Sequence, residues 1–312
     1  MGKKQLSGAA KRKKKKEKEE AIKEAAAEIE RLKLGPTALW TGLVLHHRDI
    51  FVSHVMPKLN RTDQYLFAKA NSESANLLKY AGVDVFEQDW SINECSSIST
   101  LEWAWNNMKW GGKERTGSVV DQPWFCSEVA LTNKLELLKW VREEIKCKWN
   151  ERTIIAAAYL NNLEMLKYCY SNGCPYDVEE LCRLGTNLGH LDCLRFLFDN
   201  VIPPSRLQHM EQEVAIDAAG FGHIDILKYL VEERKISEEV KIGCAAWTIA
   251  KGNFECLKYL VDEARLPLHW SYIASARCAG QTECLNYLRE KGFPEPSDEQ
   301  CARYLEKLRN SD

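Results

Sequence analysis

A short pattern of residues recurs seven times between Leu101 and Leu288, and it constrains the fold more than any other feature of the chain. Each copy has an acidic residue, a leucine two residues later, and then a basic or polar residue beside a large aromatic one. The first copy differs in having Ala104 at the leucine position. The acidic residues are 28 to 34 residues apart and are Glu102, Glu136, Glu164, Asp192, Asp225, Glu255 and Glu283. Such a period indicates one helical unit that is copied and stacked, so that each copy buries its apolar face against its neighbours.

Composition and charge narrow the function classes. The 312 residues are 45% hydrophobic and 28% charged, as in a globular protein. The net charge of −2 is uneven, because residues 1–20 carry nine Lys or Arg and three Glu, which leaves the remainder acidic. An acidic body argues against a nucleic-acid surface. No apolar run suits a signal peptide or a membrane span, so we expect a cytoplasmic or nuclear protein.

The twelve cysteines do not have the spacing of a zinc site. Cys193, Cys256 and Cys284 directly follow the acidic residue of their copies, where Met165 and Ile226 stand in sister copies. A position shared by these residue types is a core position, at which a thiol behaves as a small hydrophobe. Because no Cys-x-x-Cys pair occurs either, we expect no metal, no cofactor and no disulfide framework.

The N-terminal residues 1–34 form a charged leader. The basic run Lys11–Lys16 is followed by strong helix formers with opposite charges four residues apart, which predicts a partly helical, coiled-coil-like or disordered segment. The run is open to three interpretations: a solvated tail, a nuclear-localisation signal, or a nucleic-acid contact. The third is disfavoured because no aromatic residue for base stacking lies among the lysines.

Residues 37–82 predict a separate module of three helices. Asn60 or Thr62 can cap the second helix, and Ser72 or Ser74 can begin the third. The apolar residues at helical spacing in the first helix are Phe51, Val55, Met56 and Leu59.

This module resembles an F-box in the spacing of Val55, Met56, Leu59 and Asp63. The resemblance implies that these four residues contact the Skp adaptor of a cullin ubiquitin ligase. The sequence departs from the F-box family where His47-Arg48 replaces Leu-Pro, and residues 71–74 replace Cys-Arg-x-Trp. The alternative interpretation is that the apolar stripe packs against the neighbouring repeat.

Residues 86–296 carry the array of about seven copies. In the clearest one, Thr153–Ala158 predicts a short helix and Leu163–Tyr170 a second, which Gly173 and Pro175 end. The Ala-Ala pair of this copy, with the Gly-His-Leu-Asp and Gly-His-Ile-Asp turns of later copies, resembles ankyrin repeats. The resemblance implies an all-α solenoid, and a capping box at Ser297–Gln300 predicts a final polar helix within residues 297–312.

The copies are shorter than typical ankyrin repeats, and Gly-Cys-Pro-Tyr stands where that family has Ala-Asp-Val-Asn. The combination with an F-box-like module resembles paralogous sets in some single-celled algae and protists. The resemblance also implies that the Gly-His histidines, His190 and His223, bond to backbone in the turns. His46 and His47 have no partner nucleophile at a motif spacing, and the copied acids suit helix starts, so we expect no enzyme.

The ankyrin resemblance implies a concave binding face, lined by the ends of the first helices and by the loop tips. Three consecutive copies place Leu160, Leu188 and Phe221 there, which predicts an apolar patch, unless the short repeats tilt these residues into the stack. The predicted partner-binding residues are Trp149, Tyr159, Leu160, Tyr176, Asn187, Leu188, Phe221, Lys251 and Trp270.

The sequence therefore predicts a monomeric, intracellular scaffold that binds an unidentified protein partner. Two alternatives stay open: a substrate-receptor subunit of a cullin ubiquitin ligase, and a nuclear factor whose basic tail contacts nucleic acid. The copied basic–aromatic pairs could also be read as a nucleic-acid ladder, but their fixed position beside a leucine predicts stacked core instead. The fold alone does not identify the partner.

Overall fold

The computed structural model describes residues 47–70, 72–84, 90–113 and 119–309. All regular structure in these ranges is helical, apart from one isolated bridge between Lys113 and Val119, so the predicted all-α class is confirmed. Contacts divide the chain into two units between Met108 and Lys109. The predicted leader, residues 1–34, and residues 37–46 of the predicted module lie outside the described residues.

The N-terminal unit contains the three helical segments that the sequence predicts. The elements are α3 (Arg48–Ile50), η2 (Phe51–Val55) and η3 (Met56–Lys58), which follow one another directly, then α4 (Arg61–Ala70) and α5 (Ser72–Tyr80). Asn60 caps α4, because its side-chain oxygen accepts the backbone N–H of Asp63 at 2.7 Å. The buried core of this module consists of Phe51, Met56, Leu77 and Leu78.

The first, degenerate copy of the repeat belongs to this N-terminal unit, although we expected the array to begin at residue 86. Two elements follow the module: η5 (Ile92–Glu94) and α6 (Ile98–Asn107). The hydroxyl of Thr62 on α4 donates to Oε2 of Glu94 at 2.9 Å. The ring of Tyr65 meets that of Trp103 edge-on, with centroids 5.9 Å apart. These polar and aromatic contacts attach the copy to α4.

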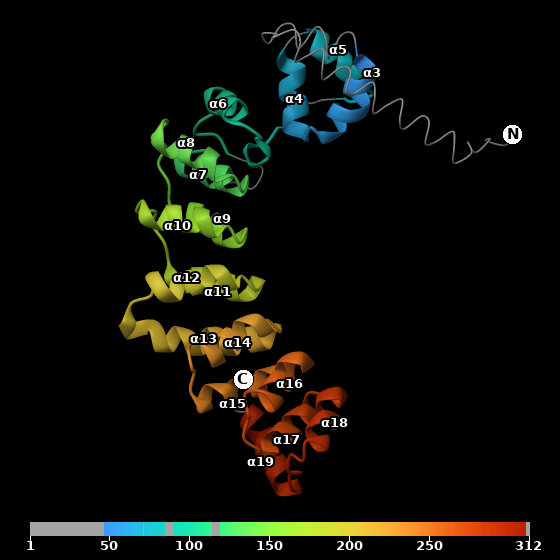
Figure 1. The fold of residues 1–312 in the computed structure, drawn as a ribbon, viewed down its shortest axis with the longest axis vertical. Helices are drawn as coiled ribbons and strands as arrows, with labels where there is room; N and C mark the ends of the chain where they lie inside the picture. The colour runs from blue at the N-terminus through green and yellow to red at the C-terminus, as the bar shows by residue number, and fades with distance from the viewer. Residues whose placement is uncertain (1–46, 71, 85–89, 114–118, 310–312) are drawn as a thin grey trace, which may run out of the picture. The chain divides into compact units, whose positions relative to one another are not determined.

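The C-terminal unit is built from consecutive helix pairs (Figure 1). Successive first helices pack against each other from α7 to α17. Among the second helices, α10 packs against α12, α14 against α16, and α16 against α18. The pairs are α7 (Gln122–Leu131) with α8 (Leu135–Glu143), α9 (Glu151–Tyr159) with α10 (Leu163–Ser171), α11 (Val178–Leu188) with α12 (Leu191–Asn200), α13 (Pro204–Phe221) with α14 (Ile224–Glu232), α15 (Glu238–Lys251) with α16 (Phe254–Asp262), and α17 (Trp270–Cys278) with α18 (Thr282–Glu290).

Each pair repeats the same local structure. The copied acidic residue lies in the first turn of each second helix, where it interacts favourably with the helix dipole. A residue with a left-handed backbone follows each first helix and turns the chain back: Asn133, Asn161, Gly189, Gly222, Gly252 and Gly280. After the last pair comes α19 (Asp298–Arg309), which the predicted capping box starts: the Ser297 hydroxyl accepts the Gln300 N–H, and the Gln300 side chain accepts the Ser297 N–H.

The cysteine of the Gly-Cys-Pro stretch closes its own pair. The buried residue after each second helix is Cys147, Cys174, Ile202, Ile236, Leu266 or Phe293, and its N–H bonds back to that helix. The thiol of Cys174 donates to the carbonyl of Asn150 at 3.3 Å, just before the first helix of its pair. The thiol of Cys147 likewise donates to the backbone carbonyl of Gln122 at 3.3 Å, at the start of the first helix of its pair. This position is therefore a core position.

The other cysteines also behave as core residues. Cys193, Cys256 and Cys284 are buried, as predicted. Burial raises the pKa of Cys193 and Cys256 to about 11, so their thiols stay protonated at neutral pH. No group of three or more potential metal ligands occurs within the described ranges. None of the helices that the structure describes is long and apolar enough to cross a membrane.

The copied basic–aromatic pairs link neighbouring helix pairs. The cation of one copy lies over the aromatic ring of the next: Lys139 Nζ is 5.6 Å from the Tyr168 centroid, and Lys228 Nζ is 5.2 Å from that of Tyr259. The Tyr259 hydroxyl donates to Glu232 Oε1 at 3.0 Å. We call this row of contacts along the second helices the aromatic seam. Its members face one another, which supports the structural interpretation over the nucleic-acid ladder.

We expect the cysteines to differ sharply in reactivity. All twelve lie in the described residues; ten are buried, Cys301 is half-buried, and Cys278 alone is exposed. Treatment of the native protein with iodoacetamide at pH 8, followed by peptide mass spectrometry, should modify Cys278 long before Cys193 or Cys256. All should react in denaturant. Equal rates for Cys256 and Cys278 in the native protein would contradict the packing described above.

Tyr259→Phe tests the aromatic seam. The variant removes the hydrogen bond to Glu232 and should lower the free energy of unfolding by about 1 kcal/mol in urea titrations. Tyr176→Phe is the matched control, because Tyr176 is 42% exposed and should change stability little. A loss at Tyr259 no greater than that of the control would show that the bond to Glu232 contributes nothing to the stack.

Candidate partner-binding face

Exposed apolar residues occur near the ends of four consecutive first helices of the C-terminal unit, while others, such as Tyr176 and Leu268, lie outside these helices. Tyr159, Leu188 and Phe221 end α9, α11 and α13 and are 54%, 40% and 52% exposed. Trp247 on α15 is 50% exposed and continues the row, one turn before the end of its helix. Large side chains with this exposure on consecutive copies are unusual for a surface without a partner. We call the surface formed by the first helices α7 to α15 the first-helix face.

Several predicted residues are less accessible than expected. Leu160 is half-buried, so it contributes less surface than its neighbour Tyr159. Trp149 is also half-buried, since the guanidinium carbon of Arg142 lies 3.8 Å from its ring centroid. Trp270 is half-buried against the His269 ring, with centroids 5.2 Å apart. The other predicted residues, Tyr176, Asn187 and Lys251, are exposed.

One groove in the first-helix face is mainly apolar, and we call it the apolar groove. It encloses about 310 Å³ across α7, α9 and α11. Tyr159 forms part of its wall, and Trp124, Leu131, Ile155 and Leu184 supply further apolar surface. Glu128 and Arg152 are the charged residues that line it. A groove of this lining suits a bulky aliphatic or aromatic side chain.

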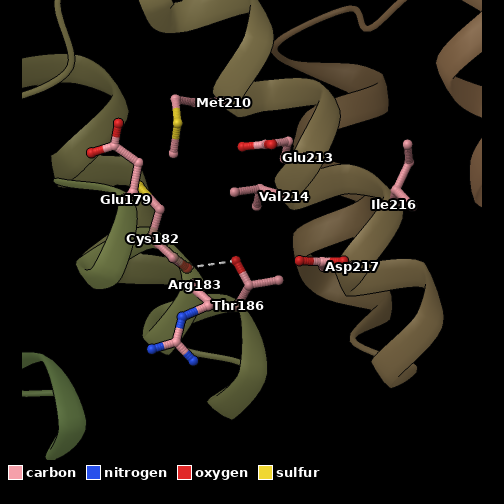
Figure 2. A pocket seen from close by; sticks show the side chains of 9 residues that line it. All are labelled: Glu179, Cys182, Arg183, Thr186, Met210, Glu213, Val214, Ile216 and Asp217. Carbon is pink, nitrogen blue, oxygen red and sulfur yellow. Dashed lines mark hydrogen bonds between the residues drawn. The ribbon is translucent and has the colours of Figure 1, made fainter.

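A second groove lies between α11 and α13 and carries several carboxylates, and we call it the acidic groove (Figure 2). It encloses about 420 Å³. Its buried floor is formed by Cys182 and Thr186 of α11 and by Met210 and Val214 of α13. The Thr186 hydroxyl is occupied, because it donates to the carbonyl of Cys182 at 2.7 Å. The charged residues around this floor are Glu179, Arg183, Glu213 and Asp217.

The carboxylates of the acidic groove are unequally compensated. Glu179 forms an ion pair with Arg206, and Glu213 lies 3.5 Å from Nδ1 of His209. Asp217 is one helical turn from Glu213 and has no ion pair among the described residues. Burial raises the pKa of Asp217 above its usual value, and the nearby charge of Glu213 raises it further. On the α13 side of this groove, Asp217 is therefore the carboxylate without an ion pair among the described residues.

Sequence reasoning found the ends of the first helices and missed the residues one turn earlier. Ile155 precedes Tyr159 by four residues, and Leu184 precedes Leu188 by four, which places each pair on one side of its helix. Both earlier residues line the apolar groove. The signal that could have found them is an apolar residue four positions before Tyr159 and before Leu188. Trp247 was missed because the register of the repeats predicted Lys251 as the contact in this copy. In the structure, Nζ of Lys251 lies 5.7 Å from the ring centroid of Trp247.

The histidines of the Gly-His turns have structural partners, as predicted. A ring N–H of His190 donates to the backbone carbonyl of Ala158 at 2.9 Å. A ring N–H of His223 donates to the backbone carbonyl of Asn187 at 3.0 Å. At the next turn, the side-chain amide of Asn253 donates to the backbone carbonyl of Gly220 at 2.7 Å. Each bond joins the turn of one helix pair to the first helix of the preceding pair. We call these bonds the turn ladder.

The predicted adaptor contacts lie in the N-terminal unit. Met56 is only 3% exposed and belongs to the core of the module, while Val55 and Leu59 are half-buried against that core. A carboxylate oxygen of Asp63 accepts the Ser96 hydroxyl at 2.7 Å. The structure thus gives internal partners to each of the four residues.

No protein-family model matches the chain, and no curated protein matches it.

Gly189→Ala tests the turn ladder. Gly189 has a φ of +76°, and an added Cβ would lie 2.8 Å from Nδ1 of His223. Gly292→Ala is the matched control, because Gly292 has a φ of +77° and nothing within 4 Å of the added atom. Both variants incur the left-handed strain of about 1–2 kcal/mol. Gly189→Ala should lose measurably more stability in urea unfolding, and equal losses would contradict a tight ladder at His223.

Proposed function

We propose that this chain is an ankyrin-type scaffold that binds a segment of a partner protein on its first-helix face. The observation that carries the proposal is the row of exposed Tyr159, Leu188, Phe221 and Trp247 on four consecutive first helices. Aromatic side chains dominate binding hot spots, since they bury a large area at a low cost in side-chain entropy. Two grooves open on the same face and could hold side chains of the partner.

The ankyrin assignment is supported by the form of each pair. Each first helix is followed by a left-handed residue, commonly glycine, and in five of the six pairs the second helix starts after a His, Asn or Gln. The turn ladder and the aromatic seam account for the polar residues that recur in the sequence. The remaining exposed apolar residues on the first helices have no such structural role.

The alternative of a cullin ubiquitin ligase receptor has weaker support. An adaptor contact through Met56 would require a residue that is buried in the module to become accessible. Asp63 would also have to exchange its bond with Ser96 for a bond to the adaptor. The basic run Lys11–Lys16, on which the nucleic-acid alternative depends, lies outside the described residues.

A triple variant tests the proposed function. Tyr159→Ser, Leu188→Ser and Phe221→Ser together should abolish retention of protein partners in affinity purification from the source cells, followed by mass spectrometry. Because these residues are exposed, we expect the melting temperature to change little. Leu268→Ser is the matched control, since Leu268 is 59% exposed and lies outside the first helices.

Two results would contradict the proposal. Full retention of every partner by the triple variant would show that binding occurs elsewhere. A large fall in melting temperature would show that the three residues stabilise the stack, as the alternative interpretation of the short repeats holds.

A further inference from the structure

We infer that the partner segment carries a lysine or arginine side chain, which the acidic groove receives while an apolar side chain of the same segment fills the apolar groove. This inference rests on the proposed function and identifies the chemistry of its ligand. Three features of the first-helix face favour such a ligand: the composition of the acidic groove, its charge, and its position relative to the apolar groove.

The acidic groove matches a long cationic side chain in composition. Its floor of Cys182, Met210 and Val214 is apolar, which suits the methylene stem of a lysine or arginine. Figure 2 shows Glu213 and Asp217 on the α13 side, facing the residues of α11 across the groove. A side chain that lies along the floor can therefore bring its charged end to these carboxylates. Both carboxylates are exposed at the rim of the groove, where they can meet the charged end of a side chain whose stem covers the floor.

The charge of the groove also favours a cation. Three carboxylates line it, against the single guanidinium of Arg183. Arg183 projects from the α11 side, away from Glu213 and Asp217, as Figure 2 shows. Glu179 has an ion pair with Arg206, and Glu213 contacts the imidazole of His209 at 3.5 Å, so Asp217 is the carboxylate of the groove without an ion pair among the described residues. The raised pKa of Asp217 agrees with this, because a bound ammonium would relieve the repulsion from Glu213.

The two grooves have a spacing that one extended peptide can span. The apolar groove is centred on α7 and α9, and the acidic groove lies between α11 and α13, two helix pairs further on. Packed helices are about 8–10 Å apart, which gives roughly 16–20 Å between the grooves. An extended chain advances about 3.3 Å per residue. The apolar and basic residues of the ligand should therefore be roughly five or six positions apart.

Selection from a phage-displayed library of random 12-residue peptides tests the inference with the full-length chain. Immobilised wild type should enrich peptides that pair a bulky apolar residue with Lys or Arg at this separation. The variant Glu213→Gln/Asp217→Asn should enrich apolar peptides without the basic preference. Glu263→Gln/Glu290→Gln is the matched control: it removes the same charge from exposed positions elsewhere and should keep the preference.

The best selected peptide then gives a quantitative test by fluorescence anisotropy. Replacing its basic residue by alanine should weaken binding to wild type at least tenfold, but less than twofold for Glu213→Gln/Asp217→Asn. Equal losses on both proteins, or enrichment of peptides without basic residues, would overturn the inference and leave the proposed function intact. Failure of the wild type to enrich any peptide would also overturn the inference, and the proposed function fails as well if the triple variant Tyr159→Ser, Leu188→Ser and Phe221→Ser retains every partner.

Discussion

The close approach of successive first helices is the constraint on which the C-terminal unit depends. The last turns of these helices carry small buried residues, such as Ala130, Ala157 and Ala158, and Ala218 and Ala219. Small side chains allow neighbouring helices to pack closely, and interiors at this density tolerate little added volume. The position of each pair therefore fixes that of the next. The surface formed by these helices is defined by the same packing, so its grooves are built on rigid elements.

Polar groups complete this packing at two places in each pair. The turn ladder satisfies carbonyls at the ends of the first helices, where four backbone acceptors of any helix lack internal partners. In the aromatic seam, the hydroxyls of Tyr168 and Tyr259 donate to Glu143 and Glu232 of the preceding pair. Because both sets of bonds lie at the turns and on the second helices, they leave the exposed surface of the first helices free to vary. This division allows the surface of the first helices to change while the fold stays constant.

Much of the fold was predictable, because the signals are local and repeated. The acidic residues at the helix starts, the buried cysteines and the Gly-His turns each recur at fixed positions, and each has the expected place in the structure. The assignment of residues 90–108 to the N-terminal unit was not predictable. It depends on contacts of Thr62 and Tyr65 with residues about thirty to forty positions away, which no local pattern encodes.

The candidate site was predictable in part for a related reason. The register of the repeats locates the ends of the first helices, and it therefore found Tyr159, Leu188 and Phe221. It did not find the acidic groove, whose α13 lining lies in the middle of that helix, away from its end. The groove depends on how the side chains of α11 and α13 meet, and the period of the repeat does not contain that information. The covering of Trp149 by Arg142 is likewise a matter of side-chain packing.

The turn ladder has a consequence for how the array comes apart. Every bond in it runs from one helix pair to the pair immediately before, so no copy is held by a distant one. Stability in such an array is a sum of nearest-neighbour terms, and opening can begin at an end without disturbing the middle. The final pairs can therefore exchange their amide hydrogens while α9, α11 and α13 stay folded. Loss of packing in the last pair should therefore cost the central copies little, because they are stabilised by their own neighbours.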